Sequence, residues 1–252
     1  MSVVLITGAG SGMGASHARL LSGQGFQVAC TDVDVDEART VAEDCAGEAM
    51  ALHADVRDLA TLRAAVAQVL DRWGRIDALV ANAGVTVAAP ASAWTVGEGD
   101  WQRVIDVNLT GVWRSVSACA EAVIAARGSF VLISSVAGLS GAAEWSPYAA
   151  AKHGVIGLMR TLANELAGTG ARCNAVCPGM VSTPMLETDR AMLGLDPLEA
   201  EAQLAAGHLE PRLLAPEEVS ETVAFLLSDK ARAINGVALP VDLGYLCRTP
   251  GT

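Results

Sequence analysis

Short runs of apolar residues alternate along the chain with longer segments in which apolar residues recur every three or four positions. The short runs predict strands at Val3–Thr7, Gln27–Thr31, Ala49–His53, Ala78–Ala81, Ser129–Ser134, Arg172–Val176 and Val237–Leu239. The longer segments predict helices at Met13–Gly23, Asp36–Cys45, Leu59–Trp73, Asp100–Ala126, Pro147–Gly168 and Pro216–Ser228. Near-continuous apolar strands separated by helices indicate a parallel sheet with helices on both faces. We therefore expect one α/β domain over residues 1–252, built on a Rossmann-type, doubly wound parallel sheet of about seven strands.

One long segment, residues 180–212, departs from this alternation. It is rich in Met, Leu and Gly and contains Pro184 and Pro197. Long loops inside compact domains commonly act as lids or binding loops. We expect residues 180–212 to be an irregular cover over a substrate pocket, and we refer to them as the lid.

Several large apolar side chains are candidates for lining that pocket. They are Met180, Met185 and Leu186 at the start of the lid, and Trp145, which a core position would suit equally well. The tryptophans of the predicted helices, Trp73, Trp101 and Trp113, are expected to be packing residues. The acidic flank of the lid, Glu187 and Asp189, favours a neutral substrate, such as a cyclic or aryl-alkyl alcohol.

Composition and charge exclude several classes of function. The formal net charge is −11, and no two basic residues are adjacent, so neither a nucleic-acid interface nor a polybasic membrane surface is expected. The uncharged stretch 78–97 contains Asn82, Gly84 and Pro90 and does not predict a spanning helix. The six cysteines include no C-x-x-C pair and the four histidines lie far apart, so we expect no metal centre. We expect a cytoplasmic protein whose partner is a small molecule.

The first predicted strand leads into a glycine-rich turn, Thr7-Gly8-Ala9-Gly10-Ser11-Gly12-Met13-Gly14. Glycines let a backbone turn sharply and approach a pyrophosphate at the N-terminus of the next helix. The pattern G-x-G-x-x-G/A fits at residues 10–15, but T-G-x-x-x-G-x-G, with Gly8, Gly12 and Gly14, fits the strand–helix junction better. Tight turns also need glycine for purely structural reasons, yet the position of this turn after the first strand favours dinucleotide binding.

Asp32 ends the second predicted strand. A carboxylate at that position accepts hydrogen bonds from the adenosine-ribose hydroxyls of NAD and repels the 2′-phosphate of NADP. The loop that follows is acidic, with Asp34, Asp36 and Glu37, and no base stands closer along it than Arg39. A solvated loop in which Asp36 caps the next helix is the structural alternative. The loop favours NAD over NADP.

Tyr148 and Lys152 stand four residues apart, although the chain contains only two tyrosines and two lysines. Side chains at i and i+4 share one helix face. Tyrosine ordinarily titrates at about pH 10, and an adjacent ammonium is expected to lower that pKa. Such a tyrosine exchanges a proton with an alcohol or carbonyl oxygen. A surface Tyr–Lys contact is the structural alternative.

These motifs, in this order and spacing, resemble those of the classical short-chain dehydrogenases/reductases, from Val3 to about Tyr245. The resemblance extends to Asp55-Val56, Asn82-Ala83-Gly84, Asn108, Ser135 and the segment Pro178-Gly179 with Val181 and Thr183. Ser135 matches better than Ser134 because it lies thirteen residues before Tyr148. Two departures are Ala81, where the family often has a second Asn, and Leu243, which interrupts a common D-G-G.

The resemblance implies hydride transfer between NAD and a secondary alcohol or its ketone. It implies that Tyr148 is the acid/base, Ser135 binds the substrate oxygen, Lys152 lowers the tyrosine pKa and binds the nicotinamide ribose, and Asn108 supports a proton-relay water. Asp55 and Val56 would contact adenine, Asn82-Ala83-Gly84 would steady the sheet, and residues 178–183 would contact the nicotinamide carboxamide. In relatives the two longest helices pair across subunits, which implies a homotetramer.

Two other functions remain open. A 3-oxoacyl-thioester reductase of the same fold would prefer NADPH and a basic patch for its carrier, whereas the lid offers only Arg190 and Arg212. A catalytically silent NAD-binding sensor or scaffold would not need the candidate catalytic residues, which are all present in this chain.

Overall fold

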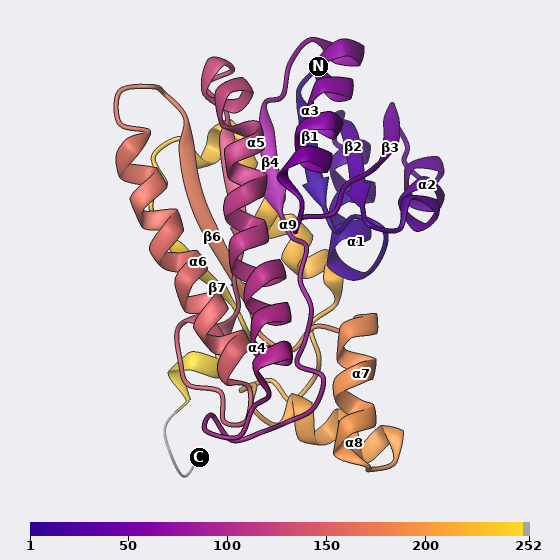
Figure 1. Ribbon diagram of the computed structural model, residues 1–252, viewed down its shortest axis with the longest axis vertical. Coiled ribbons are helices and arrows are strands. Elements are labelled where there is room, and N and C mark those ends of the chain that lie inside the picture. The colour runs from indigo at the N-terminus through magenta and orange to yellow at the C-terminus, as the bar shows by residue number, and fades with distance from the viewer. Residues whose placement is uncertain (249–252) are drawn as a thin grey trace.

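The computed structural model describes residues 1–248, which form a seven-stranded parallel sheet between two layers of helices (Figure 1). The strands are β1 (Val3–Thr7), β2 (Gln27–Asp32), β3 (Ala49–His53), β4 (Ala78–Ala81), β5 (Ser129–Ile133), β6 (Arg172–Pro178) and β7 (Ala238–Val241). Their order is β3-β2-β1-β4-β5-β6-β7, and every neighbouring pair is parallel. The predicted doubly wound sheet is confirmed, and the direction of winding reverses between β1 and β4.

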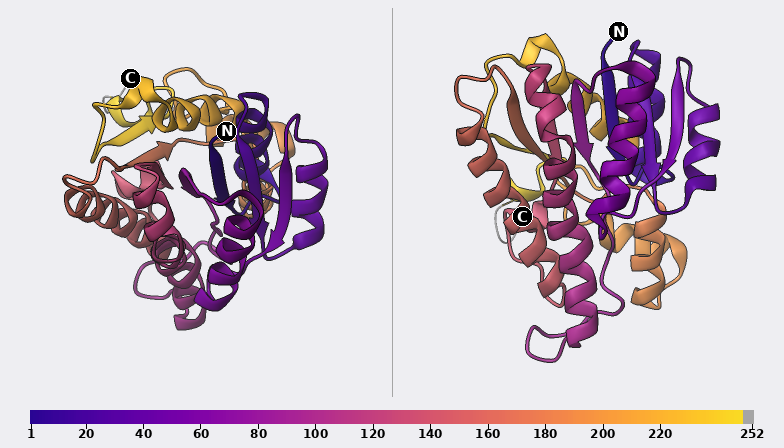
Figure 2. Two further views of the ribbon diagram at one scale, coloured as in Figure 1. Left: turned by 90° about the horizontal axis from the view of Figure 1, so that it is seen from above. Right: turned by 45° about the horizontal axis from the view of Figure 1, so that its top comes forward.

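Helices cover both faces of the sheet (Figure 2). One face carries α1 (Gly12–Gly23), α2 (Val35–Glu43) and α9 (Pro216–Leu227), and the other carries α3 (Leu59–Trp73), α5 (Gly111–Ala125) and α6 (Ser146–Glu165). Successive strand residues point to opposite faces. In β1, for example, Leu5 enters one core, and Val4 and Ile6 enter the other. Because both faces are buried, the strands are apolar at nearly every position.

The predicted helix 100–126 is divided into three parts. It consists of α4 (Glu98–Ile105), a π-helical turn (Asp106–Thr110) and α5. A π-turn inserts one extra residue into the helical repeat, often at a functional site. This turn contains Asn108, which is fully buried.

The lid is helical, so the prediction of an irregular segment was wrong. Residues 180–212 contain α7 (Pro184–Leu193) and α8 (Pro197–Ala205), which lie beyond the ends of the strands (Figure 1). Each proline stands at the first helical position, where no N–H is needed and the fixed φ suits the helix. Asp196 caps α8 by accepting hydrogen bonds from Leu198 N and Glu199 N at 2.9 and 3.1 Å. The two prolines therefore begin helices here.

The tryptophans differ in their surroundings. Trp101 and Trp113 are 38% and 49% exposed, so their expected packing role within this chain was wrong. Trp73 is half-buried, and its indole N–H donates to the Glu48 carboxylate at 3.1 Å. Within residues 1–248, no helix combines the length and the apolar character needed to cross a bilayer.

Candidate active site

Two adjoining cavities lie at the carboxyl ends of the strands, where doubly wound sheets bind ligands. A cleft of about 430 Å³ follows β1, β2 and β4, and a pocket of about 390 Å³ lies between β5, β6 and the lid. Met13, Thr183 and Met185 line both cavities. The predicted cofactor residues that line the cleft are Gly8, Ser11, Gly12, Met13, Asp32, Asp55, Val56, Asn82, Ala83, Gly84 and Thr183.

The glycine turn follows the pattern T-G-x-x-x-G-x-G. Gly8 and Gly12 have φ values of +66° and +52°, a conformation that favours glycine. A Cβ at Gly14 would lie 1.9 Å from the Gly8 carbonyl oxygen. Gly14 is absent from the residues that line the cleft, so its close approach serves the packing of α1 against the turn.

The segment after β4 supports the glycine turn. The Asn82 side-chain amide donates hydrogen bonds to the carbonyl oxygens of Thr7 and Gly8 at 3.1 and 3.0 Å. The Thr7 hydroxyl accepts from the N–H groups of Asn82 and Ala83 at 3.1 and 3.2 Å. These bonds join β1 to β4 where the winding of the sheet reverses, which agrees with the steadying role expected of this segment.

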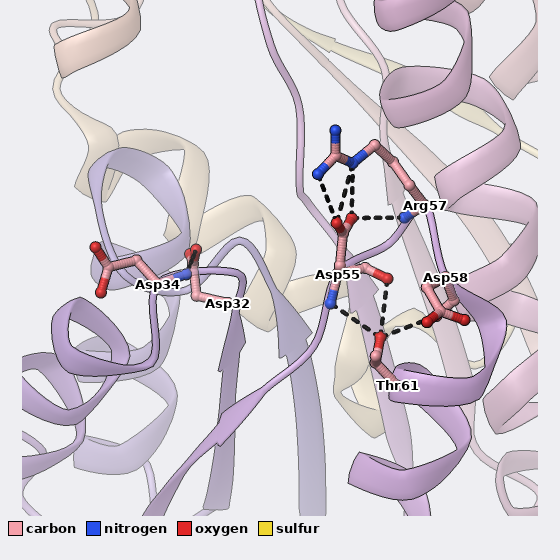
Figure 3. Close-up of polar contacts among 6 residues, drawn as sticks. All are labelled: Asp32, Asp34, Asp55, Arg57, Asp58 and Thr61. Carbon is pink, nitrogen blue, oxygen red and sulfur yellow. Dashed lines mark hydrogen bonds and ion pairs between the residues drawn. The ribbon is translucent and has the colours of Figure 1, made fainter.

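Asp32 lies at the edge of the cleft beside the turn (Figure 3). Its carboxylate accepts hydrogen bonds from Gly10 N at 2.9 Å and Asp34 N at 3.1 Å. A carboxylate has about four lone-pair positions, so these bonds leave acceptor capacity free. Asp34, rather than Asp36, caps α2, accepting from Asp36 N and Glu37 N.

Asp55 forms a bidentate ion pair with Arg57 across the cleft from Asp32 (Figure 3). Arg57 Nε and Nη2 approach the Asp55 carboxylate oxygens at 3.0 and 2.6 Å. The hydrogen bonds from Arg57 hold the pKa of the Asp55 carboxyl below its usual range. Arg57 was not predicted to line the cleft, although it directly follows Asp55-Val56. Its charge is already paired within the cleft.

Tyr148 and Lys152 lie on the face of α6 that packs toward β5. The Lys152 ammonium lies over the Tyr148 ring, 5.5 Å from its centroid, and donates a hydrogen bond to Ile133 O at 2.9 Å. Trp145 packs edge-to-face on Tyr148, with ring centroids 6.2 Å apart. The surface-contact alternative is excluded, because Lys152 is only 3% exposed.

Burial controls the titration of this pair. It lowers the pKa of Lys152 to about 8 and raises the pKa of Tyr148 to about 12, while the polar side chain of Ser135 opposes the rise. The expected lowering of the tyrosine pKa by Lys152 is therefore not found. Removal of the phenol from water disfavours phenolate by more than its neighbours favour it.

The two adjacent serines at the end of β5 have different partners. Ser134 donates a hydrogen bond to Lys152 O at 2.9 Å, which joins the strand to α6. Ser135 lines the same pocket as Tyr148 and lowers the pKa of its phenol, and the Ser135 hydroxyl oxygen accepts from Ala137 N at 3.1 Å. This arrangement supports the preference for Ser135 as the residue that acts with Tyr148.

Asn108 is bound to the segment after β4. Its side-chain oxygen accepts from Val85 N, and its side-chain nitrogen donates to Val85 O, each at 2.8 Å. A Cβ at Gly84 would lie 3.5 Å from Asn108 Oδ1 and 3.8 Å from Lys152 Nζ. Asn108 and Lys152 therefore flank Gly84, but both polar atoms of the Asn108 side chain are bonded to backbone.

The second cavity is lined mainly by apolar side chains. Trp145, Met180, Met185 and Leu186, which were expected here, line it with Ser135 and Tyr148. Pro178, Gly179 and Val181 also line this pocket and not the cleft. Among the lining residues that were not predicted are Pro90, Met192, Leu204 and Tyr245. Met192 and Leu204 fall within the lid and share its apolar character, which was the available signal.

The base of the lid is held by His208. Its Nδ1 lies 2.6 Å from Arg212 O, and its Nε2 accepts from Met180 N at 3.1 Å. His208 also packs edge-to-face on Tyr245. Leu243, which interrupts the family's D-G-G, has φ +46°, so a non-glycine residue here adopts a conformation that favours glycine.

Comparisons with known proteins agree with this geometry. The model of the enoyl-(acyl carrier protein) reductase family matches residues 8–246. The chain is 38% identical to (-)-trans-carveol dehydrogenase of Rhodococcus erythropolis, over 97% of this chain and 96% of the relative. It is also 38% identical to cyclohexanol dehydrogenase of Acinetobacter sp. (strain SE19), over 96% and 94%.

A solved structure shares the fold throughout. Carveol dehydrogenase from Mycobacterium avium in complex with NAD superposes with a TM-score of 0.91 at 36% identity, covering 98% of both chains. Matches of this extent in sequence and structure, together with the motifs assembled around the two cavities, lead to one conclusion. The chain belongs to the classical short-chain dehydrogenase/reductase family.

Proposed function

We propose that this protein is an NAD-dependent oxidoreductase that interconverts a neutral, cyclic secondary alcohol and its ketone. The observation that carries the proposal is the position of Tyr148 and Ser135, which line the same apolar pocket beside the cleft that the glycine turn and Asp32 line. A group that exchanges protons therefore lies beside a site suited to a hydride carrier.

The cleft fits NAD. The first residues of α1 have N–H groups without intrahelical partners, and the left-handed conformations of Gly8 and Gly12 let the backbone approach a pyrophosphate. Asp32 has free acceptor capacity for ribose hydroxyls, and its charge opposes a 2′-phosphate. When bound, NAD supplies a nicotinamide ring that accepts or donates hydride.

The residues of the chain perform the proton transfer. Ser135 and Tyr148 would hold the substrate oxygen between their hydroxyls. In alcohol oxidation the Tyr148 phenolate accepts the hydroxyl proton, and in ketone reduction the phenol returns it. Lys152, fixed by its bond to Ile133 O, keeps a cation beside the ring. The apolar lining keeps water away from the reacting carbon.

The substrate class follows from the lining and the relatives. Apolar side chains surround the phenol, and no Lys or Arg lines the pocket within the described part of the chain. Two relatives are named for ring alcohols, carveol and cyclohexanol. A 3-oxoacyl-thioester reductase is less well supported, because a phosphate-bearing carrier would find no cation here. A silent NAD-binding scaffold would leave the Tyr148–Ser135 pair without a purpose.

We also propose a homotetramer in the cytoplasm. Trp101 and Trp113 are exposed on α4 and α5, and Phe225 and Val237, each 40% exposed, lie on α9 and just before β7. Exposed large apolar side chains at two separate places suit two kinds of subunit contact. The six cysteines are free thiols, as is usual in a reducing compartment.

The proposal is tested by incubating the purified protein with NAD or NADP and a panel of secondary alcohols, and following formation of the reduced cofactor. We expect NAD reduction with cyclohexanol, carveol or similar ring alcohols. Failure to reduce NAD with every ring alcohol, in protein that binds NADH, would support the scaffold.

A further inference from the structure

One carboxylate enters the apolar pocket from the lid. Asp189 lies on α7 and lines the pocket together with Met185, Leu186 and Tyr148. Its Oδ1 accepts a hydrogen bond from the Thr86 hydroxyl at 2.9 Å. Its Oδ2 has no hydrogen-bond partner among residues 1–248. The pocket therefore contains an acceptor that the protein leaves available.

Among residues 1–248, no Lys or Arg lines the pocket to balance this carboxylate. The neighbouring Arg190 is directed to Glu187 and Glu201 on the lid, and none of these three residues lines the pocket. The other acid that does line it, Glu144, is exposed. Burial raises the pKa of Asp189 to about 6, so the carboxylate is mostly ionised at neutral pH.

Asp189 and Tyr148 line the same pocket. The negative charge of Asp189 contributes to raising the pKa of the Tyr148 phenol. A ring whose hydroxyl meets Tyr148 is thus exposed to the charge of Asp189. Asp189 is half-buried, and among the described residues it has no counter-ion in the pocket. A charge in this position is costly, and a donor on the substrate would relieve that cost, whereas a second anion would increase it.

We propose that Asp189 is a specificity-determining residue that selects ring alcohols bearing a second hydrogen-bond donor and rejects ring alcohols bearing a carboxylate. The selected donor is a hydroxyl or an ammonium on the ring, away from the reacting carbon. This inference rests on the proposed function, because it assigns the substrate class of the same pocket.

A purely structural role for Asp189 is the competing explanation. The Thr86 hydrogen bond joins α7 to the segment after β4, and so it could serve only to hold the lid. Two variants separate the roles. Asp189→Asn keeps an acceptor for Thr86 and removes the charge, whereas Thr86→Val removes the bond and keeps the charge.

The test uses three substrates that differ at one ring position: cyclohexanol, 4-aminocyclohexanol and 4-hydroxycyclohexanecarboxylate. Values of kcat/KM are measured with NAD for the wild type, both variants and Glu187→Gln. Glu187→Gln is the matched control, since it removes one negative charge from the same helix outside the pocket.

For the wild type we expect kcat/KM to be about 10-fold higher with 4-aminocyclohexanol than with cyclohexanol. We expect it to be about 10-fold higher with cyclohexanol than with 4-hydroxycyclohexanecarboxylate. Asp189→Asn should change the ammonium-to-carboxylate ratio by about 100-fold, while Thr86→Val and Glu187→Gln keep the wild-type order. Unchanged ratios in Asp189→Asn, or equal changes in either of the other variants, would overturn the proposal. If wild-type protein that binds NADH oxidises none of the three alcohols, the proposed function fails instead.

Discussion

The Lys152 ammonium lies over the Tyr148 ring, 5.5 Å from its centroid, and is fixed there by a 2.9 Å hydrogen bond to Ile133 O. Lys152 is buried and Tyr148 is half-buried, and this burial moves their pKa values toward the neutral forms, to about 12 for Tyr148 and about 8 for Lys152. At neutral pH the phenol is therefore protonated. It is ready to donate a proton to a ketone and must lose its own proton before it can accept one from an alcohol.

This titration sets the pH dependence of the two directions. The phenolate fraction grows with pH up to the raised pKa of Tyr148. Alcohol oxidation should therefore become faster as the pH rises from neutrality, and ketone reduction should not. Values of kcat/KM measured in both directions between about pH 6 and pH 9 check this. Oxidation that slows with rising pH would show that the phenolate is not the base.

Cofactor choice should depend on Asp32 itself and not on the acidity of its loop. Asp32→Asn removes the charge that we propose meets the adenosine ribose, and we expect the NAD-to-NADP ratio of kcat/KM to fall by about 10- to 100-fold. Asp34→Asn is the matched control, because it removes a charge two residues away and asparagine still caps α2. Equal falls in both variants would mean that only the overall charge of the loop matters.

Gly14 should be intolerant of a side chain. A Cβ at this position would lie 1.9 Å from the Gly8 carbonyl oxygen, whereas one at Gly23 in the same helix would meet nothing within 4 Å. We expect Gly14→Ala to lower the free energy of unfolding by several kcal/mol and to weaken NADH binding, because the turn must move. Gly23→Ala should change the free energy of unfolding by less than about 1 kcal/mol. Urea unfolding and NADH titration of both variants measure these effects.

His17 should make the fold sensitive to acid. It is fully buried between α1 and α9, with Nδ1 2.7 Å from the Ser220 hydroxyl oxygen, and burial lowers its pKa from 6.5 to about 3. Between these values the unfolded chain binds a proton and the folded chain does not. The contribution of the neutral His17 to the free energy of unfolding is therefore fully present above pH 6.5 and is lost as the pH falls toward 3.

When the pH is lowered from 7 to 4, the titration of His17 alone should reduce the free energy of unfolding by about 3 kcal/mol. Urea unfolding at the two pH values should show a smaller loss for His17→Gln than for the wild type. His153→Gln, at an exposed histidine, should keep the wild-type loss. If the three proteins lose the same stability, the buried histidine is not the cause.

The alternation of strands and helices was predictable because both faces of the sheet are covered. Residues such as Val3–Thr7 are apolar at every position but the last, and a fully buried strand requires this. The helices of the lid were not predictable in the same way. Pro184 and Pro197 look like breaks in a sequence, and their place at helix starts depends on caps and packing in three dimensions.

The residues of the site were predictable where a motif fixes them. Gly8, Gly12, Ser135 and Tyr148 lie at the cavities as expected. The direction in which the pKa of Tyr148 is shifted was not predictable, because the spacing to Lys152 indicates that the two side chains are close but not how deeply they are buried. Pairs such as Asp189 with Thr86 come from segments that are distant in the sequence, and they are brought together only in the folded chain. Trp113 was misjudged because an apolar residue at a helical position can lie on either a buried or an exposed face of the helix.

The proposed function depends on proton transfer by Tyr148. The most direct measurement compares the wild type and Tyr148→Phe for NAD reduction by a ring alcohol, together with NADH binding by fluorescence. We expect turnover to fall by at least about 1000-fold in Tyr148→Phe, while NADH affinity stays within a few-fold of the wild type. Turnover that persists near the wild-type rate in Tyr148→Phe would show that Tyr148 does not transfer the proton.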